Sequence, residues 1–465
     1  MKVKNCLFLV FFHLIPGCLL SLPAAGQGRY TAIHSGISWF DQNHNEVNAH
    51  GACIVKEGDK YYLFGEYKTD SANLFIGFSC YSSTDLMNWK FERKVLAKQT
   101  DGLLGPNRIG ERVKVMKCPE TGEFVMYMHT DDRKYNDPHI GYATCKTIDG
   151  DYRFQGALLY GGEPIRRWDM GTFQDSNGKG YLLIHHGVIY ELSSDYKSAE
   201  RLVASGQASG ESPAMFKNKG VYYWLSSNLT SWERNDNFYL TAASLEGPWT
   251  KRGLFAPEGS LTWNSQCSFV LPVTNQHDTL FVYVGDRWSF PKQGSAATQV
   301  WLPISLKDNS FSIPEFIDKW RVDFPEAKWS PVAFVKESIK EKIRDRKGNW
   351  QVEAGLTTAN EQGALLTYSY KGRQVGIQGV SNNTSGYARI AIKDGDNREI
   401  INTVVDFYSK YEDESLKFVS PRMKKDNYTM TIEVLGEHGT WSDKRKNVFG
   451  STDNFVRVAD VFTIK

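Results

Sequence analysis

The sequence has little charge imbalance and almost no helical periodicity, and these absences exclude several classes of protein. Its 55 basic and 53 acidic residues leave a formal net charge of +2, so we expect no basic surface for a nucleic acid. After the N-terminal residues, no segment approaches the roughly 20 consecutive apolar residues that a membrane helix needs. We therefore expect a globular protein with no membrane span and no nucleic-acid partner.

Motifs for metals, phosphates and nucleophilic triads are also missing. The seven cysteines show no Cys-x-x-Cys spacing, so zinc is not indicated and no metal-binding residue is predicted. Five of them lie beyond the N-terminal segment, and we expect mostly free, buried thiols. No Ser-His-Asp ordering or glycine-rich phosphate loop stands out. No cofactor is required. Calcium binding is possible in either of the two domains predicted below, although no Asp-rich loop has the necessary spacing.

Residues 1–26 have the pattern of a secretory signal peptide. Two lysines precede an apolar run over residues 7–22, and small residues follow it. We expect cleavage near Ala25 and an exported protein, periplasmic or extracellular. The alternative is lipoprotein anchoring at Cys18, because residues 15–18 loosely resemble a lipobox.

Five similar segments recur between residues 61 and 285. Each combines an apolar or aromatic strand, a polar hinge and a second strand, and the segments begin with residues 61–66, 124–129, 181–186, 222–227 and 280–285. Their irregular spacing fits four-stranded blades with uneven loops better than a short solenoid repeat. Interpreting these strands as the first strands of five blades, we predict an all-β fold with a five-bladed β-propeller, which gathers functional residues at its axis.

The length of 465 residues favours two domains. We predict a catalytic propeller over residues 30–330 and a jelly-roll β-sandwich over residues 340–465. The charged run over residues 336–347 is interpreted as a short exposed helix or a linker. Beyond residue 350, several segments alternate apolar and polar residues, as strands of a half-solvated sandwich do.

The C-terminal part resembles the galactose-binding-like modules that accompany many carbohydrate enzymes. The resemblance rests on Gly386-Tyr-Ala-Arg-Ile-Ala-Ile-Lys-Asp-Gly395, Thr403-Val-Val-Asp-Phe-Tyr408 and the strand over residues 428–435. It implies a carbohydrate-binding or docking module, although a purely structural role is also open.

Carboxylates at strand ends are the candidates for chemistry. Glu66, Glu111, Asp169 and Glu211 each come from a different blade region, so a propeller would bring them together. Hydrolysis of a glycosidic bond needs one carboxylic acid that stays protonated and a second group that activates water or attacks the sugar. Neighbouring negative charge raises the pKa of the acid that must stay protonated. Each carboxylate alone could equally be a turn or surface residue.

An ordered series of motifs over about residues 30–330 resembles glycoside hydrolase family 43, and most closely its exo-β-1,3-galactanase subfamily. The motifs are Asn48-Ala-His-Gly51, Phe64-Gly-Glu66, Glu111-Arg-Val-Lys-Val115, Met128-His-Thr-Asp131, Trp168-Asp-Met-Gly-Thr-Phe-Gln-Asp175, Gly210-Glu-Ser-Pro-Ala-Met-Phe216 and Asn264-Ser-Gln266. The family fold is a five-bladed propeller, in agreement with the repeat count, and most members invert the anomeric centre.

The resemblance implies that Glu211 is the general acid and that Asp169 orients it and tunes its pKa. Residues 48–51 contain no carboxylate, so the usual first-blade base is missing. In the galactanase-like subfamily a later residue is proposed to hold the water, and Gln266 matches that position. A neutral amide cannot accept a proton as a carboxylate does, so Gln266 would need an imidic-acid tautomer or a positioning role. Glu111 is the other candidate.

The same resemblance matches Glu66 and Tyr135 to positions that bind the terminal sugar. Trp232, Trp263 and Trp288 are suited to stack on a sugar ring, or to pack inside a blade. We therefore expect a secreted inverting exo-glycosidase that releases galactose from β-1,3-galactan, the backbone of arabinogalactan. The alternatives are an α-L-arabinofuranosidase or β-xylosidase on the same fold, and a noncatalytic glycan-binding propeller. The expected partner is in each case an oligo- or polysaccharide.

Overall fold

The computed structural model of the protein describes residues 30–443 and 445–465 and is built almost entirely of β-strands. Within these residues the helical elements are two short turns, η1 (Gly102–Leu104) and α1 (Leu261–Asn264). The all-β prediction is therefore confirmed. In the described part of the chain, no helix is long and apolar enough to cross a membrane. The predicted signal peptide, residues 1–26, lies outside the described residues.

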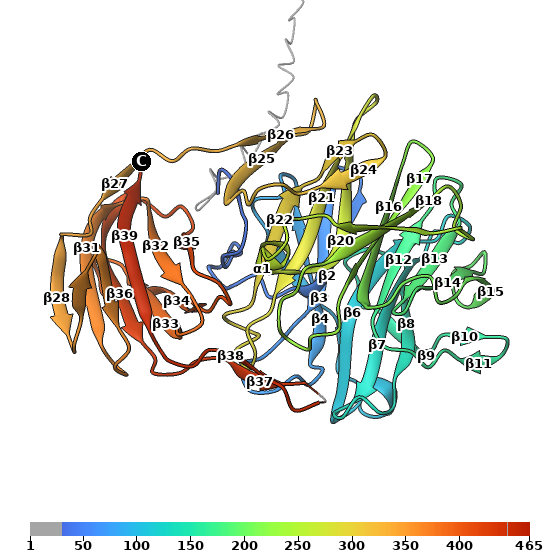
Figure 1. Cartoon of the computed structure of the whole chain (residues 1–465), viewed down its shortest axis with the longest axis horizontal. Coiled ribbons are helices and arrows are strands. Elements are labelled where there is room, and N and C mark those ends of the chain that lie inside the picture. Colours follow the sequence, from blue (N-terminus) through green and yellow to red (C-terminus); the bar gives the residue numbers. More distant parts are fainter. Residues whose placement is uncertain (1–29, 444) are drawn as a thin grey trace, which may run out of the picture.

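Five sheets follow one another along the chain, and their main strands pair antiparallel in sequence order (Figure 1). Sheet I contains β2 (His50–Glu57), β3 (Lys60–Glu66), β4 (Gly77–Ser83) and β5 (Lys90–Ala97). Sheet II contains β6 (Arg108–Lys117), β7 (Phe124–Asp132), β8 (His139–Cys145) and β9 (Arg153–Ala157). Sheet III contains β12 (Met170–Gln174), β13 (Gly180–Ile184), β14 (Val188–Leu192) and β15 (Ala199–Ala204), extended at its outer edge by β10 (Leu159–Tyr160) and β11 (Glu163–Pro164), of which β10 pairs parallel with β15.

Sheets IV and V complete the series. Sheet IV contains β16 (Glu211–Asn218), β17 (Val221–Ser227), β18 (Phe238–Ala242) and β19 (Thr250–Leu254). Sheet V contains β20 (Gln266–Thr274), β21 (Thr279–Arg287) and β22 (Thr298–Pro303). Smaller sheets are formed by β1 (Ile33–His34), β25 (Lys319–Asp323) and β26 (Lys328–Pro331), by β23 (Ser305–Lys307) and β24 (Ser310–Ser312), and by β37 (Thr440–Ser442) and β38 (Val448–Gly450).

The first strands of the five sheets contact one another in an order that returns to its start. β2 contacts β6, β6 contacts β12, β12 contacts β16, β16 contacts β20, and β20 contacts β2. Separate hydrophobic clusters fill the spaces between neighbouring sheets. Burial of apolar surface at about 25 cal/mol per Å² is the main force that holds such sheets together. The five first strands therefore share one central region.

One sequence-based interpretation was wrong in detail. The five recurring segments form β3, β7, β13, β17 and β21, which are the second strands of their sheets. The hydrophobic clusters between neighbouring sheets cover both faces of these inner strands, so their sequences are almost continuously apolar. The first strands carry more polar residues because they border the central region.

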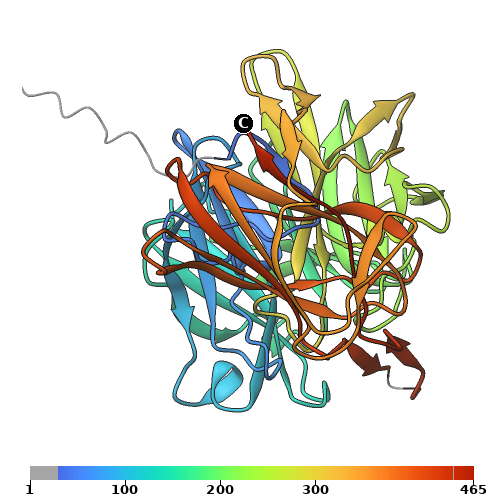
Figure 2. The same cartoon turned by 90° about the vertical axis from the view of Figure 1, so that its left-hand side faces the viewer.

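The C-terminal residues form two further antiparallel sheets around one shared core (Figures 1 and 2). One contains β27 (Lys336–Ser338), β29 (Gln351–Glu353), β30 (Leu356–Ala359), β39 (Val456–Ile464), β32 (Gln374–Ser381) and β35 (Asp413–Val419). The other contains β28 (Ile343–Lys347), β31 (Leu365–Gly372), β36 (Asp426–Val434), β33 (Tyr387–Lys393) and β34 (Glu399–Asp406). Residues 336–347 are thus neither helix nor linker: they supply β27 and β28.

The prediction of mostly free, buried thiols is confirmed for the five described cysteines. All five are unbonded; Cys145 is partly exposed and the others are buried. Burial raises the pKa of the Cys53 thiol to about 11, as expected for an inert core thiol.

Replacement of Gly171 on β12 tests whether the close packing of sheets III and IV requires a residue without a side chain. A Cβ atom at Gly171 would lie 2.1 Å from the backbone oxygen of Pro213, so Gly171→Ala must push two first strands apart. We expect it to lower the free energy of unfolding by about 1–3 kcal/mol, the usual cost of overpacking. Urea denaturation measures this. Gly395→Ala is the control, because the nearest atom to its Cβ lies 3.9 Å away; equal stability of both variants would contradict the packing argument.

Candidate active site

Bulges at the starts of the first strands aim polar side chains into the central region. On β2, β6 and β16 the pairing slips by one residue directly after His50, Glu111 and Glu211. The residue that follows each of them has a left-handed backbone: Gly51 at φ 58°, Arg112 at 57° and Ser212 at 55°. Such a bulge re-aims side chains at the end of a strand. Because Arg112 and Ser212 are not glycines, their conformation is strained and depends on the surrounding contacts.

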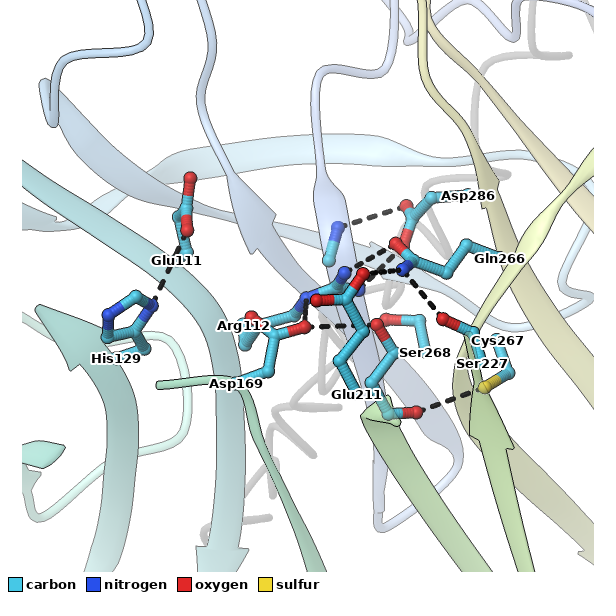
Figure 3. Close-up of polar contacts among 12 residues, drawn as sticks. Glu111, Arg112, His129, Asp169, Glu211, Ser227, Gln266, Cys267, Ser268 and Asp286 are labelled. Carbon is cyan, nitrogen blue, oxygen red and sulfur yellow. Dashed lines mark hydrogen bonds and ion pairs between the residues drawn. The ribbon is translucent and has the colours of Figure 1, made fainter. Parts of the chain in front are cut away.

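The Arg112 guanidinium connects residues of several sheets in the central region (Figure 3). Its Nε lies 3.1 Å from Oδ2 of Asp169, and Nη2 donates a 2.5 Å hydrogen bond to Oε1 of Gln266. Nη1 lies 3.7 Å from Oδ2 of Asp286. Burial alone would lower the Arg112 pKa, but the surrounding carboxylates, chiefly Asp169 and Asp286, together outweigh this effect and raise the pKa above its ordinary value. Arg112 therefore stays cationic and holds these groups together.

Glu211 has the protonation behaviour of an acid catalyst. Burial and the nearby charge of Asp169 raise the pKa of Glu211 to about 8, against the opposing effect of Arg112. Asp169 is held in place by Arg112 and by a 3.0 Å hydrogen bond from the Ser212 hydroxyl. Near neutral pH, Glu211 therefore carries a proton that it can donate.

All four hydrogen-bonding positions of the Gln266 amide are occupied (Figure 3). Nε2 donates to Oε1 of Glu211 (3.0 Å) and to Oγ of Ser227 (2.9 Å). Oε1 accepts from Arg112 and from Nε1 of Trp288 (2.9 Å). Two donors face the oxygen and two possible acceptors face the nitrogen, so the orientation of the amide is fixed.

Glu111 is an ionised carboxylate in a network of donors. Its Oε1 accepts hydrogen bonds from Asn73 Nδ2 (2.8 Å) and Tyr135 Oη (2.9 Å), and its Oε2 lies 3.4 Å from Nδ1 of His129. Burial alone would raise the pKa of Glu111, but Lys68 and His129 lower it well below its ordinary value. Burial also opposes protonation of His129, yet the carboxylates of Asp131 and Glu111 raise the His129 pKa to about 9.

Glu66 joins Glu111 through Lys68. The Lys68 ammonium lies 2.6 Å from Oε2 of Glu66 and 3.7 Å from Oε1 of Glu111. Oε1 of Glu66 accepts a 2.8 Å hydrogen bond from the backbone N–H of Arg112. Burial raises the pKa of Glu66 in spite of Lys68. The predicted sugar-binding residues Glu66 and Tyr135 thus lie in one network with Glu111.

Two of the three predicted tryptophans lie beside these groups. Trp288 donates to Gln266, and its ring centre is 5.3 Å from that of Trp232. The Lys68 ammonium is 6.0 Å from the Trp232 ring. Trp263 is not brought into this group: its indole N–H donates to the Ile313 carbonyl, and its ring packs in the core between sheets IV and V.

One group of described residues could offer ligands to a cation. Single atoms of Glu111, His129 and Asp169 lie within 4.8 Å of one another. The possible ligand atoms are already engaged in other contacts. His129 is protonated near neutral pH, so its imidazole has no lone pair for a cation, and Asp169 is paired with Arg112. The imidazole also differs from the all-oxygen shell that calcium prefers.

Four central residues had no role in the sequence-based prediction. Arg112 and His129 stand inside the recognised motifs, Lys68 follows Glu66 closely, and Asp286 comes directly after a strand-forming segment. Charged residues within or beside apolar strands were the available signal. Asp286 is 1% exposed and accepts a hydrogen bond from the Gly51 N–H, a contact across two sheets that no local pattern reveals.

Comparison with known proteins identifies the family. The model of glycosyl hydrolases family 43 matches residues 46–252. The structure of a candidate exo-β-1,3-galactanase from Bifidobacterium bifidum s17 is 38% identical, with a TM-score of 0.57, over 60% of this chain and 95% of the other. The chain belongs to glycosyl hydrolases family 43. It is a glycoside hydrolase, so the predicted family and enzyme class are confirmed.

Two further structures resemble this family 43 chain. The exo-β-1,3-galactanase Pc1,3Gal43A from Phanerochaete chrysosporium was solved with galactose. The match covers 93% of this chain and 100% of the galactanase chain, with 24% identity and a TM-score of 0.68. The family 43 β-1,3-galactosidase BT3683, solved with galactodeoxynojirimycin, is 28% identical over 62% of this chain and 100% of its own, with a TM-score of 0.57. A search of curated proteins found no match. The first of these likenesses extends the shared fold to the C-terminal sheets.

The raised pKa of Glu211 predicts the alkaline limb of the pH profile. Glu211, the predicted general acid, can donate its proton only while protonated, so we expect kcat/KM to fall as the pH rises through about 8. Asp169→Asn removes the neighbouring negative charge and should move this limb to lower pH, besides slowing the reaction. Asp278→Asn, at an exposed position, is the control. A limb that stays in place in Asp169→Asn would show that another group controls it.

Proposed function

We propose that this family 43 enzyme is an inverting exo-glycosidase that releases galactose from the ends of β-1,3-galactan, such as the arabinogalactan backbone. The protonated Glu211 beside the charged Asp169 carries the proposal, because it supplies the acid that must donate a proton to the leaving oxygen. The similarity to galactanase and galactosidase structures supports galactose as the sugar. Glu66, Tyr135 and the Trp232–Trp288 pair would bind the terminal sugar.

We further propose that Glu111 activates the water and that Gln266 positions Glu211. An imidic acid at Gln266 would place an O–H group against two donors, Arg112 and Trp288, neither of which can accept it. Glu111 is ionised, and among the described residues its Oε2 has only the long 3.4 Å contact with His129. That oxygen keeps a lone pair that could accept a proton from water.

The proposed function implies a particular arrangement of the sheets into two domains. We propose that sheets I to V are the five blades of a propeller with the active site on its axis, over residues 30–330. The two C-terminal sheets would form a jelly-roll sandwich that accompanies it; β27 (Lys336–Ser338) places their start slightly before the predicted boundary of residues 340–465. We also propose export, periplasmic or extracellular, directed by the segment over residues 1–26; N-terminal sequencing of the mature protein tests its removal.

Replacement of Glu211 tests the acid role. On β-1,3-galactobiose, Glu211→Gln should lower kcat by about 10²–10⁴-fold, the usual contribution of a general acid. An aryl β-galactoside whose phenol leaves without protonation should lose much less. Glu200→Gln, on the exposed side of β15, is the control. Full activity of Glu211→Gln on the disaccharide would overturn the mechanism, and turnover of aryl arabinofuranosides or xylosides in preference to galactosides would overturn the sugar assignment.

Azide distinguishes Glu111 from Gln266. An anionic nucleophile needs no base, so azide should restore activity to Glu111→Ala and yield the α-galactosyl azide that inversion requires. Gln266→Ala should respond little, because its defect would lie in the placement of Glu211. Proton NMR of the released sugar and azide follows both variants. If azide rescued Gln266→Ala but not Glu111→Ala, Gln266 rather than Glu111 would be the residue that activates water. Products of β configuration from the unmodified enzyme would contradict inversion.

A further inference from the structure

Two loops of sheets IV and V carry the aromatic wall of the proposed sugar site. Residues 228–237 join β17 to β18 and include Trp232, and residues 288–297 join β21 to β22 and begin with Trp288. Both loops leave the sheets beside the catalytic groups, since Glu211 pairs with Ser227 and Gln266 with Asp286 at the ends of the preceding strands. The position of these loops therefore decides where a sugar can stack.

The first loop is clamped by the C-terminal domain. The Tyr408 hydroxyl donates a 2.8 Å hydrogen bond to Oε2 of Glu233, directly after Trp232. The next residue, Arg234, is only 3% exposed, and its guanidinium lies 5.1 Å from the Tyr408 ring and 5.9 Å from the Trp441 ring. A buried cation over two aromatic faces is an attractive contact that water does not weaken.

The second loop is held by the same C-terminal segment. The Ser289 hydroxyl donates a 2.8 Å hydrogen bond to Oδ2 of Asp406, two residues before Tyr408. Arg234 also donates a 2.5 Å hydrogen bond to the Trp288 carbonyl. The two loops are thus tied both to each other and to the end of β34 and the residues after it.

These contacts lead directly to the acid. Trp288 donates to Gln266, and Gln266 donates to Glu211. The Trp232 ring lies 5.7 Å from that of Phe290, with the two planes 7° apart. The C-terminal domain therefore contacts the backbone and side chains that hold Trp232 and Trp288, and Trp288, which is 4% exposed, contacts the amide that binds Glu211.

We propose that the C-terminal domain is a working part of the active site, in which Tyr408 and Asp406 are positioning residues for the Trp232–Trp288 wall. The proposal rests on the proposed function, in that this wall stacks on the terminal galactose. A wall held in its binding position before the sugar arrives loses less side-chain freedom on binding, so affinity rises. The role differs from that of an independent module that only tethers the enzyme to its polymer.

The test compares Tyr408→Phe with Tyr370→Phe in the full chain. Tyr408→Phe keeps the ring beneath Arg234 but removes the bond to Glu233, whereas the Tyr370 hydroxyl is buried without a partner among the described residues. For Tyr408→Phe we expect KM for β-1,3-galactobiose to rise about 3- to 10-fold with a smaller change in kcat. The tryptophan bands of its near-UV circular dichroism should also change, because Trp232 and Trp288 lose a fixed environment. Tyr370→Phe should alter neither. Ser289→Ala, on the other loop, should act in the same direction as Tyr408→Phe.

Unchanged KM and unchanged near-UV spectra in both Tyr408→Phe and Ser289→Ala would overturn the proposal, even if stability fell. A wild-type enzyme that neither binds nor cleaves β-1,3-galactobiose would instead refute the proposed function. In that case the near-UV spectra still decide whether the C-terminal domain orders the tryptophan wall, since this measurement needs no sugar. The failures of the two hypotheses are therefore distinguishable.

Discussion

The buried charge of Arg112 is the constraint on which the active site depends. A guanidinium without water is tolerated only when carboxylates and hydrogen-bond acceptors surround it, and removal of one partner leaves the other charge uncompensated. Its partners Asp169, Gln266 and Asp286 come from or beside sheets III and V, and its own backbone N–H binds Glu66 of sheet I. One side chain of sheet II thus fixes the relative positions of groups on several sheets, and it limits how far burial and Asp169 raise the Glu211 pKa.

The same local device recurs where these groups are presented. A bulge follows His50, Glu111 and Glu211 in three different sheets, and each is followed by a left-handed residue. In sheet I that residue is Gly51, where a Cβ atom would lie 2.1 Å from Oε1 of Glu66. Glycine leaves room for the Glu66 carboxylate there. At Arg112 and Ser212 the side chain is needed, because each binds Asp169, and this contact offsets the backbone strain.

The strands and the principal acids could be predicted from the sequence, but the residues that contact those acids could not. Apolar segments such as residues 222–227 predicted the β-fold, and the resemblance to family 43 selected Glu211, Asp169 and Gln266. Contacts between sheets cannot be read locally: neither the role of Arg112 nor the link of Trp288 to Gln266 follows from spacing. The run at residues 336–347 misled because β28 is an edge strand whose charged side chains are mostly exposed, so its composition resembles that of a linker.

The arrangement separates the source of stability from the site of chemistry. The carboxyl groups of Glu111 and Asp169 are buried close to Glu211, and the cost of removing such polar groups from water opposes assembly of the sheets. The hydrophobic clusters between neighbouring sheets lie away from these charges and include fully buried side chains such as Trp301 and Trp224. Because each such cluster buries large apolar surfaces, it can offset the unfavourable charges near the first strands. The raised Glu211 pKa can therefore persist, since the energy that sustains it comes from packing elsewhere in the same sheets.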